Sequence, residues 1–462
     1  MADSHSLPRL LVAGLAGDSG KTIFSLGLLL AARVRSLPGA AFKKGPDYID
    51  AAWLSWAAGI PTRNLDTHLM GFRNAEHSFL RYALPGGLNI IEGNRGLYDG
   101  MDADGTHSSA VLAKLLKAPV ILVVNAAKVT RTAAALVLGC QQLDPEVDIA
   151  GVILNRVAGR RHESVLRAAI ESACGIPVLG ALPRAEERAV LPERHLGLVT
   201  PDEHPRIDKL ASSLHELVVR NVEFDHIVSI ASKAAPLRVE LPAARSPLNG
   251  QGLKIGYVRD SAFNFYYPEN LEALAASGAR LVPLSALSSA ELPRDLDALY
   301  IGGGFPETHG AAISSNRCFL AGLKNAASGG LPIYAECGGL MLLSSAVVWR
   351  GDTYPMAGVF PFAVEMCGAP QGHGYVELVV DRPNPFFSPG TIIKGHEFHY
   401  SRVLPGGRLP QTACQVQRGT GAYDGRDGII LDNVWASYAH VHALGTPEWA
   451  QGLLQAAAAR PH

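Results

Sequence analysis

Short apolar runs alternate with helix-like stretches through the first half of the chain. The predicted buried strands are residues 10–13, 88–91, 120–124 and 150–154. The predicted amphipathic helices are residues 22–35, 108–116 and 131–138. This alternation of strand and helix is typical of a parallel sheet covered by helices on both faces, so we expect an α/β domain.

The alternation stops at a proline-rich segment and then resumes. Residues 236–252 have no apolar period, which predicts a linker between a domain at 1–235 and a second domain at 253–462. The predicted strands of the second domain are residues 254–258, 280–283, 298–301 and 331–335. Beyond Gly358 the apolar runs become shorter, which favours an α/β domain that finishes with antiparallel strands.

The amino-acid composition indicates which binding partners and which cellular compartment to expect for the protein. A chain of 462 residues exceeds what one hydrophobic core usually supports, which agrees with two domains. A formal charge of −1 argues against nucleic acid and favours a small-molecule substrate. The six cysteines form no CxxC pair, so we expect a reducing, cytoplasmic setting. The apolar run at 10–17 is too short to span a membrane, and no membrane association is expected.

A glycine-rich turn follows the first predicted strand. Gly14, Gly17 and Gly20 precede Lys21 and Thr22, and a helix-like stretch follows at once. Backbone N–H groups of such a turn bind phosphate, the lysine reaches the β- and γ-phosphates, and the threonine hydroxyl binds Mg²⁺. The strict motif places its first glycine one residue after Gly14, so a tight turn with an exposed lysine is the alternative to a nucleotide site.

Charged residues cluster in two further loops where predicted strands end. One loop holds Lys43, Asp47 and Asp50, and the other places Glu92 just beyond a buried strand. Because ligands of open α/β sheets bind at this edge, Asp47 and Glu92 are predicted to hold Mg²⁺ together with the P-loop threonine. A solvated loop residue is the alternative for either acid. Asn155 is predicted to reach an adenine edge, with a strand-end cap as the alternative.

The second half contains a candidate nucleophile. The predicted strand at 331–335 runs into Glu-Cys-Gly-Gly, so Cys337 stands at a strand-to-helix turn of the nucleophile-elbow kind. We expect the helix N-terminus to lower the pKa of this thiol and the glycines at 302–304 to complete an oxyanion hole. His440 and His442, predicted to share one face of a strand, are candidate bases. A buried structural cysteine is the alternative.

Together these segments resemble the cobyrinic acid a,c-diamide synthase family, whose members amidate acetate side chains of tetrapyrroles. The stretches that carry the resemblance are KKGPDYID (43–50), RNLDTHLMG (63–71), EGNRGLYDG (92–100), LPERHLGLV (191–199), RDSAFNFYYPENLE (259–272), GGGFPE (302–307), ECGGLM (336–341), KGHEFHYS (394–401) and ASYAHVH (436–442). The resemblance implies a dethiobiotin-synthetase-like P-loop domain, which shares the displaced glycine at Gly14. It also implies a C-terminal class-I glutamine amidotransferase domain.

The resemblance implies an ATP- and glutamine-dependent amide synthetase. ATP with Mg²⁺ would convert a tetrapyrrole acetate into an acyl phosphate, and ammonia from L-glutamine would displace the phosphate. Cys337 would attack glutamine with His440 as base and His442 in reserve; the usual glutamate two residues after the base is absent, so a Cys–His pair replaces a triad. The a- and c-acetates would be amidated in turn by a homodimer. The candidate substrate-binding residues are Lys43, Asp47, Tyr48, Asp50, Asp99, Gly303 and Gly304.

The identity of the tetrapyrrole is less defined. Asn125 replaces the aspartate that usually ends its strand, EGNRG replaces EGVMG, and the C-terminal stretch NVWASYAHVHALGTPEW also departs from the cobyrinate pattern. These departures favour a branch that amidates sirohaem or sirohydrochlorin. A cobyric-acid-type synthetase acting on other side chains is one alternative. Another is a P-loop ATPase with a non-catalytic amidotransferase-like domain, against which the intact Cys337 and His440 argue.

Overall fold

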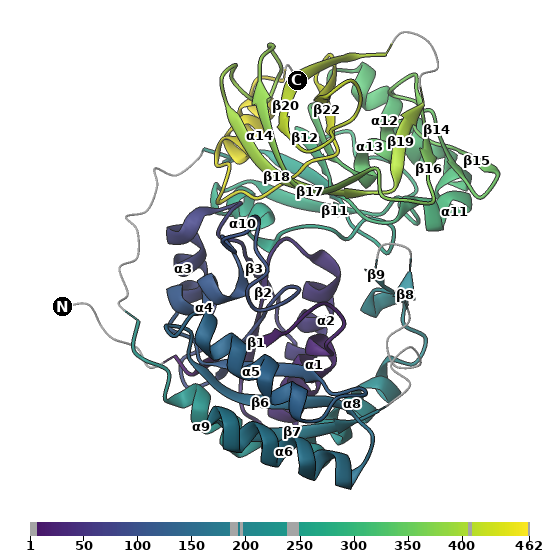
Figure 1. The fold of residues 1–462 in the computed structure, drawn as a ribbon. Coiled ribbons are helices and arrows are strands. Elements are labelled where there is room, and N and C mark those ends of the chain that lie inside the picture. The colour runs from purple at the N-terminus through teal and green to yellow at the C-terminus, as the bar shows by residue number, and fades with distance from the viewer. Residues whose placement is uncertain (1–6, 185–192, 195–196, 238–248, 405–408, 461–462) are drawn as a thin grey trace. The chain divides into compact units, whose positions relative to one another are not determined.

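The chain forms two compact units, Met1–Ala243 and Ala244–His462. The computed structural model describes residues 7–184, 193–194, 197–237, 249–404 and 409–460 (Figure 1). Residues 238–248 of the predicted linker lie outside the described residues.

The N-terminal unit is built on a seven-stranded parallel sheet in the order β3-β2-β4-β1-β5-β6-β7. Its strands are β1 (Arg9–Gly14), β2 (Gly39–Lys44), β3 (Arg63–Leu65), β4 (Leu88–Glu92), β5 (Val120–Asn125), β6 (Ile149–Val157) and β7 (Val178–Pro183). Strands β1 and β4 are buried at every position. This burial on both faces explains their unbroken apolar sequences. A separate two-stranded ribbon is formed by β8 (Glu193–Arg194) and β9 (Gly197–Leu198).

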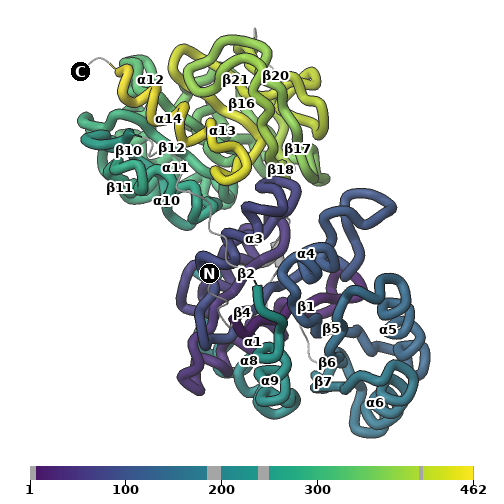
Figure 2. Tube along the Cα trace, turned by 90° about the vertical axis from the view of Figure 1, so that its left-hand side faces the viewer, coloured from purple at the N-terminus to yellow at the C-terminus, as the bar shows by residue number. Residues whose placement is uncertain are grey.

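Helices cover both faces of this sheet. Helices α1, α8 and α9 lie on one side, and α5 and α6 lie on the other (Figure 2). The helices are α1 (Lys21–Val34), α2 (Tyr48–Ala58), α3 (Gly71–Tyr82), α4 (Ser109–Leu115), α5 (Arg131–Leu143), α6 (Arg160–Cys174), the 3₁₀ turn η1 (Pro201–Glu203), α8 (Ile207–Asn221) and α9 (Phe224–Ser232). The predicted α/β class is confirmed, and each strand and helix predicted for this half is present.

The C-terminal unit is built on a ten-stranded mixed sheet in the order β11-β10-β12-β13-β22-β21-β20-β17-β18-β23. The neighbours from β11 to β22 are parallel, and those from β22 to β23 are antiparallel. The strands of this sheet are β10 (Lys254–Val258), β11 (Arg280–Leu284), β12 (Ala298–Ile301), β13 (Ile333–Glu336), β17 (Gly372–Val380), β18 (Ile392–His399), β20 (Gln411–Arg418), β21 (Arg426–Leu431), β22 (Val434–Ser437) and β23 (His440–Val441). A four-stranded sheet beside it contains β14 (Ala346–Trp349), β15 (Asp352–Pro355), β16 (Ala363–Met366) and β19 (Ser401–Leu404).

Two apolar clusters fill the faces of the large sheet. One cluster includes residues of α11, α12 and α13, and the other includes residues of α10 and α14. These elements are α10 (Pro268–Ala276), the 3₁₀ turn η2 (Pro306–His309), α11 (Gly310–Ser315), α12 (Arg317–Ser328), α13 (Gly338–Leu343) and α14 (Glu448–Ala458). Among the described residues, no helix is both long and apolar enough to cross a bilayer.

The ends of two predicted strands differ from the structure for local reasons. The strand predicted at 331–335 begins at Ile333, just after Pro332, which has no N–H to donate to a ladder. The single strand expected through both histidines is interrupted after Ser437. The N–H groups of Tyr438 and Ala439 donate to the side chains of Asp427 and Ser437, so they are lost to strand pairing.

Burial in the N-terminal sheet yields a stability prediction. Leu122, fully buried in β5, is expected to cost about 2–5 kcal/mol in free energy of unfolding when replaced by alanine, because a cavity remains. The same change at Leu136, which is 48% exposed on α5, should cost less than about 0.5 kcal/mol. Urea unfolding of both variants measures the difference; equal losses would contradict the assigned burial.

Candidate functional site

The loop between β1 and α1 has the backbone of a phosphate-binding turn. Gly20 caps α1 with a φ of 93°, a conformation that favours glycine. A Cβ atom on Gly20 would lie 2.1 Å from Asn155 Nδ2, so the position has no room for a side chain. Asn155 Nδ2 in turn donates to Ser19 O at 3.0 Å. Strand β6 therefore supports the loop through this amide, and the adenine contact expected of Asn155 stays a prediction.

Lys21 folds back over the same loop. Its ammonium donates to the carbonyl oxygens of Ala16 at 3.1 Å and Arg95 at 2.8 Å. Burial and the nearby Lys43 ammonium lower the pKa of Lys21. The ammonium group thus lies at the mouth of the turn, where a phosphate oxygen would replace its carbonyl partners.

Glu92 lies at the end of β4 and is completely buried. Its Oε1 atom accepts from the Thr22 hydroxyl at 3.2 Å and from Lys43 Nζ at 2.8 Å. Its Oε2 atom has no hydrogen-bond partner among the described residues. A carboxylate oxygen and a threonine hydroxyl are hard ligands of the kind that Mg²⁺ prefers, so these two side chains fit a magnesium site.

Lys43 compensates the buried charge of this cluster. Its ammonium contacts Asp50 Oδ2 at 2.6 Å as well as Glu92. Burial alone would lower the pKa of Lys43, but the carboxylates of Asp50 and Glu92 raise it above the ordinary value. Removing one partner of such a buried pair costs about 3–5 kcal/mol, because the other charge is left uncompensated.

Asp47 has two features that a solvated loop residue lacks. Its side chain accepts from the N–H of Asp50 at 2.9 Å and so caps α2. Burial raises the pKa of Asp47 to about 7, and the Asp50 carboxylate adds to the rise. The carboxyl group therefore titrates near neutrality. A metal contact by Asp47 stays a prediction.

The other candidates of this unit are spread along the same edge of the sheet. Tyr48 is the first residue of α2. Asp99 is exposed and accepts from the N–H of Gly96 at 2.8 Å, which shapes the loop after β4. A Cβ on Gly14 would lie 2.8 Å from Ser19 Oγ, whereas one on Gly17 would meet open space. The candidates whose side chains contact one another are Thr22, Lys43, Asp50 and Glu92.

In the C-terminal unit, Cys337 forms the turn between β13 and α13. Its φ of 48° and ψ of −96° are strained for a residue with a side chain, at a cost of about 1–3 kcal/mol. Its N–H donates to Ser437 O at 2.7 Å, which fixes the turn against β22. The side chain is 7% exposed. The predicted elbow geometry is therefore present.

The glycine turn after β12 lies between Cys337's turn and His440. A Cβ on Gly303 would approach His440 Cε1 to 2.4 Å, so the imidazole lies directly on this glycine. A Cβ on Gly338, next to Cys337, would lie 3.0 Å from Gly304 N. The backbone amide of Gly304 is thus close to the nucleophile turn, where an oxyanion-hole donor is needed.

The two candidate bases face different carboxylates. His440 Nδ1 lies 3.6 Å from Glu336 Oε2, whereas His442 Nε2 lies 3.7 Å from Glu269 Oε2. All four side chains are buried. The imidazole of His440 also stacks on that of His396, with ring centroids 4.9 Å apart. Each histidine therefore has its own surroundings rather than one shared strand face.

The pKa of the Cys337 thiol differs from the expectation. Burial raises it, and the negative charge of Glu307 raises it further. The N–H of Gly338 does lower the pKa, as expected of a helix N-terminus, but burial outweighs it. The sequence could not reveal this, because it shows the elbow but not how completely the surrounding chain encloses the sulfur.

Sequence reasoning missed three residues around the candidate bases. Glu336 immediately precedes the candidate nucleophile Cys337, and His396 belongs to the stretch KGHEFHYS, so both lie in segments that carry the family resemblance. Glu269 lies on α10 within another quoted stretch. Glu336 and His396 reach His440 through strand pairing, and Glu269 reaches His442 from α10. Local sequence patterns do not reveal such contacts between distant segments.

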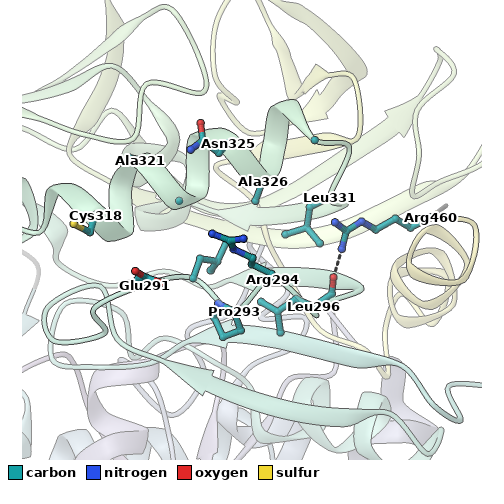
Figure 3. Close-up of a pocket in the computed structure, with 13 residues that line it drawn as sticks. Glu291, Pro293, Arg294, Leu296, Cys318, Ala321, Asn325, Ala326, Leu331 and Arg460 are labelled. Atoms are coloured by element: carbon teal, nitrogen blue, oxygen red, sulfur yellow. Dashed lines mark hydrogen bonds between the residues drawn. The ribbon is translucent and has the colours of Figure 1, made fainter. Parts of the chain in front are cut away.

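A surface pocket of about 440 Å³ lies elsewhere in the C-terminal unit (Figure 3). It runs between α12, which carries Asn325, and the segment with Arg294. Arg460 donates to Leu296 O at one end of it. None of the predicted site residues lines this pocket.

Two domain families match the chain. The CobQ/CobB/MinD/ParA nucleotide binding domain matches residues 10–199, and the CobB/CobQ-like glutamine amidotransferase domain matches residues 254–448. The two matches contain the P-loop cluster and the Cys337 turn, respectively. The chain is thus an ATP-using, glutamine-dependent carbon–nitrogen ligase.

Curated relatives match along almost the whole length. Cobyrinate a,c-diamide synthase of Magnetococcus marinus is 44% identical over 451 residues, 96% of either chain. The proteins of that name from Methanothermobacter thermautotrophicus and Archaeoglobus fulgidus are 41% and 39% identical, over 96% and 95% of this chain and 98% and 95% of their own. With both domains present and in the same order, this chain belongs to the cobyrinate a,c-diamide synthase family.

Proposed function

We propose that this protein amidates the a- and c-acetate carboxylates of a cobyrinic-acid-type tetrapyrrole, in the cytoplasm, with ATP and glutamine. The observation that carries the proposal is the cluster at the P-loop, where Thr22 and Lys43 converge on one oxygen of buried Glu92 and leave the other oxygen available. A plain glutaminase would not need it. The names of the full-length relatives support the choice of tetrapyrrole.

The N-terminal unit would activate the carboxylate. The backbone of the turn before α1 and the Lys21 ammonium would bind the nucleotide's phosphates. Thr22 and Glu92 would hold Mg²⁺, which neutralises charge on the phosphate that is transferred. The carboxylate oxygen of the substrate would displace ADP to give an acyl phosphate. Without that step a carboxylate is too poor an electrophile for ammonia.

Substrate carboxylates would meet the loop after β2. At neutral pH Asp47, whose pKa is about 7, is partly protonated and can donate to a carboxylate that a fully ionised aspartate would repel. Tyr48, Asp50 and Asp99 complete the proposed contact set. Lys43, already bound to two carboxylates, would mainly hold Asp50 and Glu92 in place.

The C-terminal unit would release ammonia. Because burial keeps the Cys337 thiol neutral, His440 would take its proton as the sulfur attacks the amide carbon of glutamine. The Gly304 N–H would stabilise the oxyanion. As the C–N bond breaks, the imidazolium returns the proton to the leaving ammonia. Water then hydrolyses the thioester to glutamate, and the ammonia displaces phosphate from the acyl phosphate.

Mass spectrometry tests the substrate. With ATP, Mg²⁺ and glutamine, we expect cobyrinic acid to lose about one mass unit for each carboxylate converted to an amide, in two successive steps. Sirohydrochlorin and sirohaem, offered in parallel, test the branch that Asn125, EGNRG and the C-terminal stretch NVWASYAHVHALGTPEW favour. Turnover of sirohydrochlorin or sirohaem without turnover of cobyrinic acid would assign the protein to that branch. No mass change with any macrocycle would exclude tetrapyrrole amidation.

Mutations should affect the activation of the carboxylate and the hydrolysis of glutamine separately. Cys337→Ala is expected to abolish glutamine-dependent amidation but to keep turnover with high ammonium, because the activation step is untouched. Lys21→Ala should abolish amidation from both nitrogen sources and leave basal glutamine hydrolysis. Both variants are assayed for amide product and for glutamate. Loss of glutaminase in Lys21→Ala with amidation intact would reverse the assignment of the two units.

Glu92→Gln tests the proposed magnesium site. We expect the Mg²⁺ concentration for half-maximal amidation to rise by about tenfold or more, because a neutral amide binds the ion poorly. Calorimetric titration with Mg²⁺ and a non-hydrolysable ATP analogue gives the same comparison without turnover. Glu146→Gln, at a side chain that is 80% exposed, is the matched control. An unchanged Mg²⁺ dependence in a folded Glu92→Gln protein would remove Glu92 from the site.

A further inference from the structure

We infer that Glu336, the residue before the nucleophile, is the positioning acid for His440 and replaces the glutamate that triad amidotransferases carry after their histidine. The inference rests on the proposed roles of Cys337 and His440. It goes beyond the expected Cys–His pair, because it assigns a third side chain to the hydrolysis of glutamine.

The carboxylate of Glu336 is held in place from two sides. Its Oε2 atom accepts from the Tyr300 hydroxyl at 3.1 Å, and its Oε1 atom accepts from Val441 N at 3.2 Å. Asn270 Nδ2 donates to the Tyr300 oxygen at 3.4 Å and to Val441 O at 2.7 Å. Glu336 is completely buried, so these bonds satisfy a carboxyl group that water does not reach.

The same carboxylate faces the base. His440 Nδ1 lies 3.6 Å from Glu336 Oε2, just beyond hydrogen-bond distance, as catalytic contacts often are without substrate. Two structural facts keep this pair together. Glu336 ends the strand that leads into Cys337, and Val441 N, next to His440, donates to its carboxylate. The nucleophile, acid and base are therefore joined by adjacent backbone segments.

The surroundings determine what this carboxylate can do. The titratable groups that face the His440–Glu336 pair include His396 from β18, stacked on the imidazole, and the hydroxyl of Tyr300 from β12. The Tyr266 and Tyr334 hydroxyls and the Cys337 thiol also lie near Glu336, whose carboxylate adds to the rise of their pKa values. Burial and the neighbouring His440 hold the pKa of His396 well below its ordinary value, so His396 stays neutral. Glu336 is thus the carboxyl group that faces Nδ1 of His440.

In this arrangement Glu336 acts through the imidazole. A carboxylate at Nδ1 favours the tautomer with its proton on Nδ1, which leaves the lone pair of Nε2 to accept the thiol proton. It also stabilises the imidazolium that forms when the sulfur attacks. Glu336 itself keeps its charge and transfers no proton, so the proton passes from Cys337 to His440 and then to ammonia.

The chain contains a matched control. Glu269 and His442 form a second buried carboxylate–histidine contact at 3.7 Å, on the other candidate base. Glu336→Gln and Glu269→Gln therefore make the same chemical change at comparable burial. If His440 is the base, only the first change should slow glutamine hydrolysis.

We expect Glu336→Gln to lower kcat for glutamine hydrolysis by about 100-fold with KM for glutamine within about twofold. The acidic limb of its kcat/KM profile should move to lower pH, because the amide no longer favours the protonated imidazole. Tyr300→Phe should lower kcat by less, and Glu336→Asp should recover part of the loss. Glu269→Gln should stay within about threefold of the parent, and all four variants should keep ammonium-dependent amidation.

Three results would overturn the inference. These are full glutaminase activity in Glu336→Gln, a loss carried by Glu269→Gln instead, and a parallel loss of ammonium-dependent amidation, which would make the role of Glu336 structural. Glutaminase assays of Cys337→Ala and His440→Ala distinguish failure of the positioning role of Glu336 from failure of the proposed function. If either of them retains glutaminase activity, the site itself is misassigned; if both lose it while Glu336→Gln does not, only the positioning role fails.

Discussion

The ion pair between Lys43 and Glu92 is a product of strand register. The two residues are direct neighbours across β2 and β4, at the carboxyl ends of both strands. A slip of one residue in either strand would turn its side chain to the face of the sheet opposite its partner and leave a buried carboxylate without its counter-charge. The positions of Thr22 and Asp50 at this edge depend on the same pair, since each contacts one of its members.

Strand register also brings distant side chains together in the C-terminal unit. Glu336 is paired with Ser437 across β13 and β22, so the chain after Ser437 must pass the nucleophile turn. The Asp427 carboxylate accepts a hydrogen bond from the N–H of Tyr438, and β22 ends at the preceding residue, Ser437. His440 consequently arrives beside Glu336 on β18's edge.

Much of this could be predicted from the sequence, and the rest could not for identifiable reasons. Unbroken apolar runs predict the buried strands. Glycines at turns predict the P-loop and the elbow at Cys337. Both are local signals. The contacts of Glu336 and the raised thiol pKa arise from pairing and enclosure between distant segments, which local patterns do not encode. The linker assignment has not been tested, because its middle lies outside the described residues.

Gly303 has a consequence for how this enzyme family could change over evolutionary time. The imidazole of His440 rests on it so closely that a single methyl group would displace the ring. Glycine and alanine codons differ by one nucleotide. If His440 is the base proposed above, one substitution at this codon would impair glutamine use while Cys337 and His440 are both retained, and the enzyme would depend on free ammonium. Under the same proposal, residue 303 would distinguish glutamine use from ammonium use in a gene sequence.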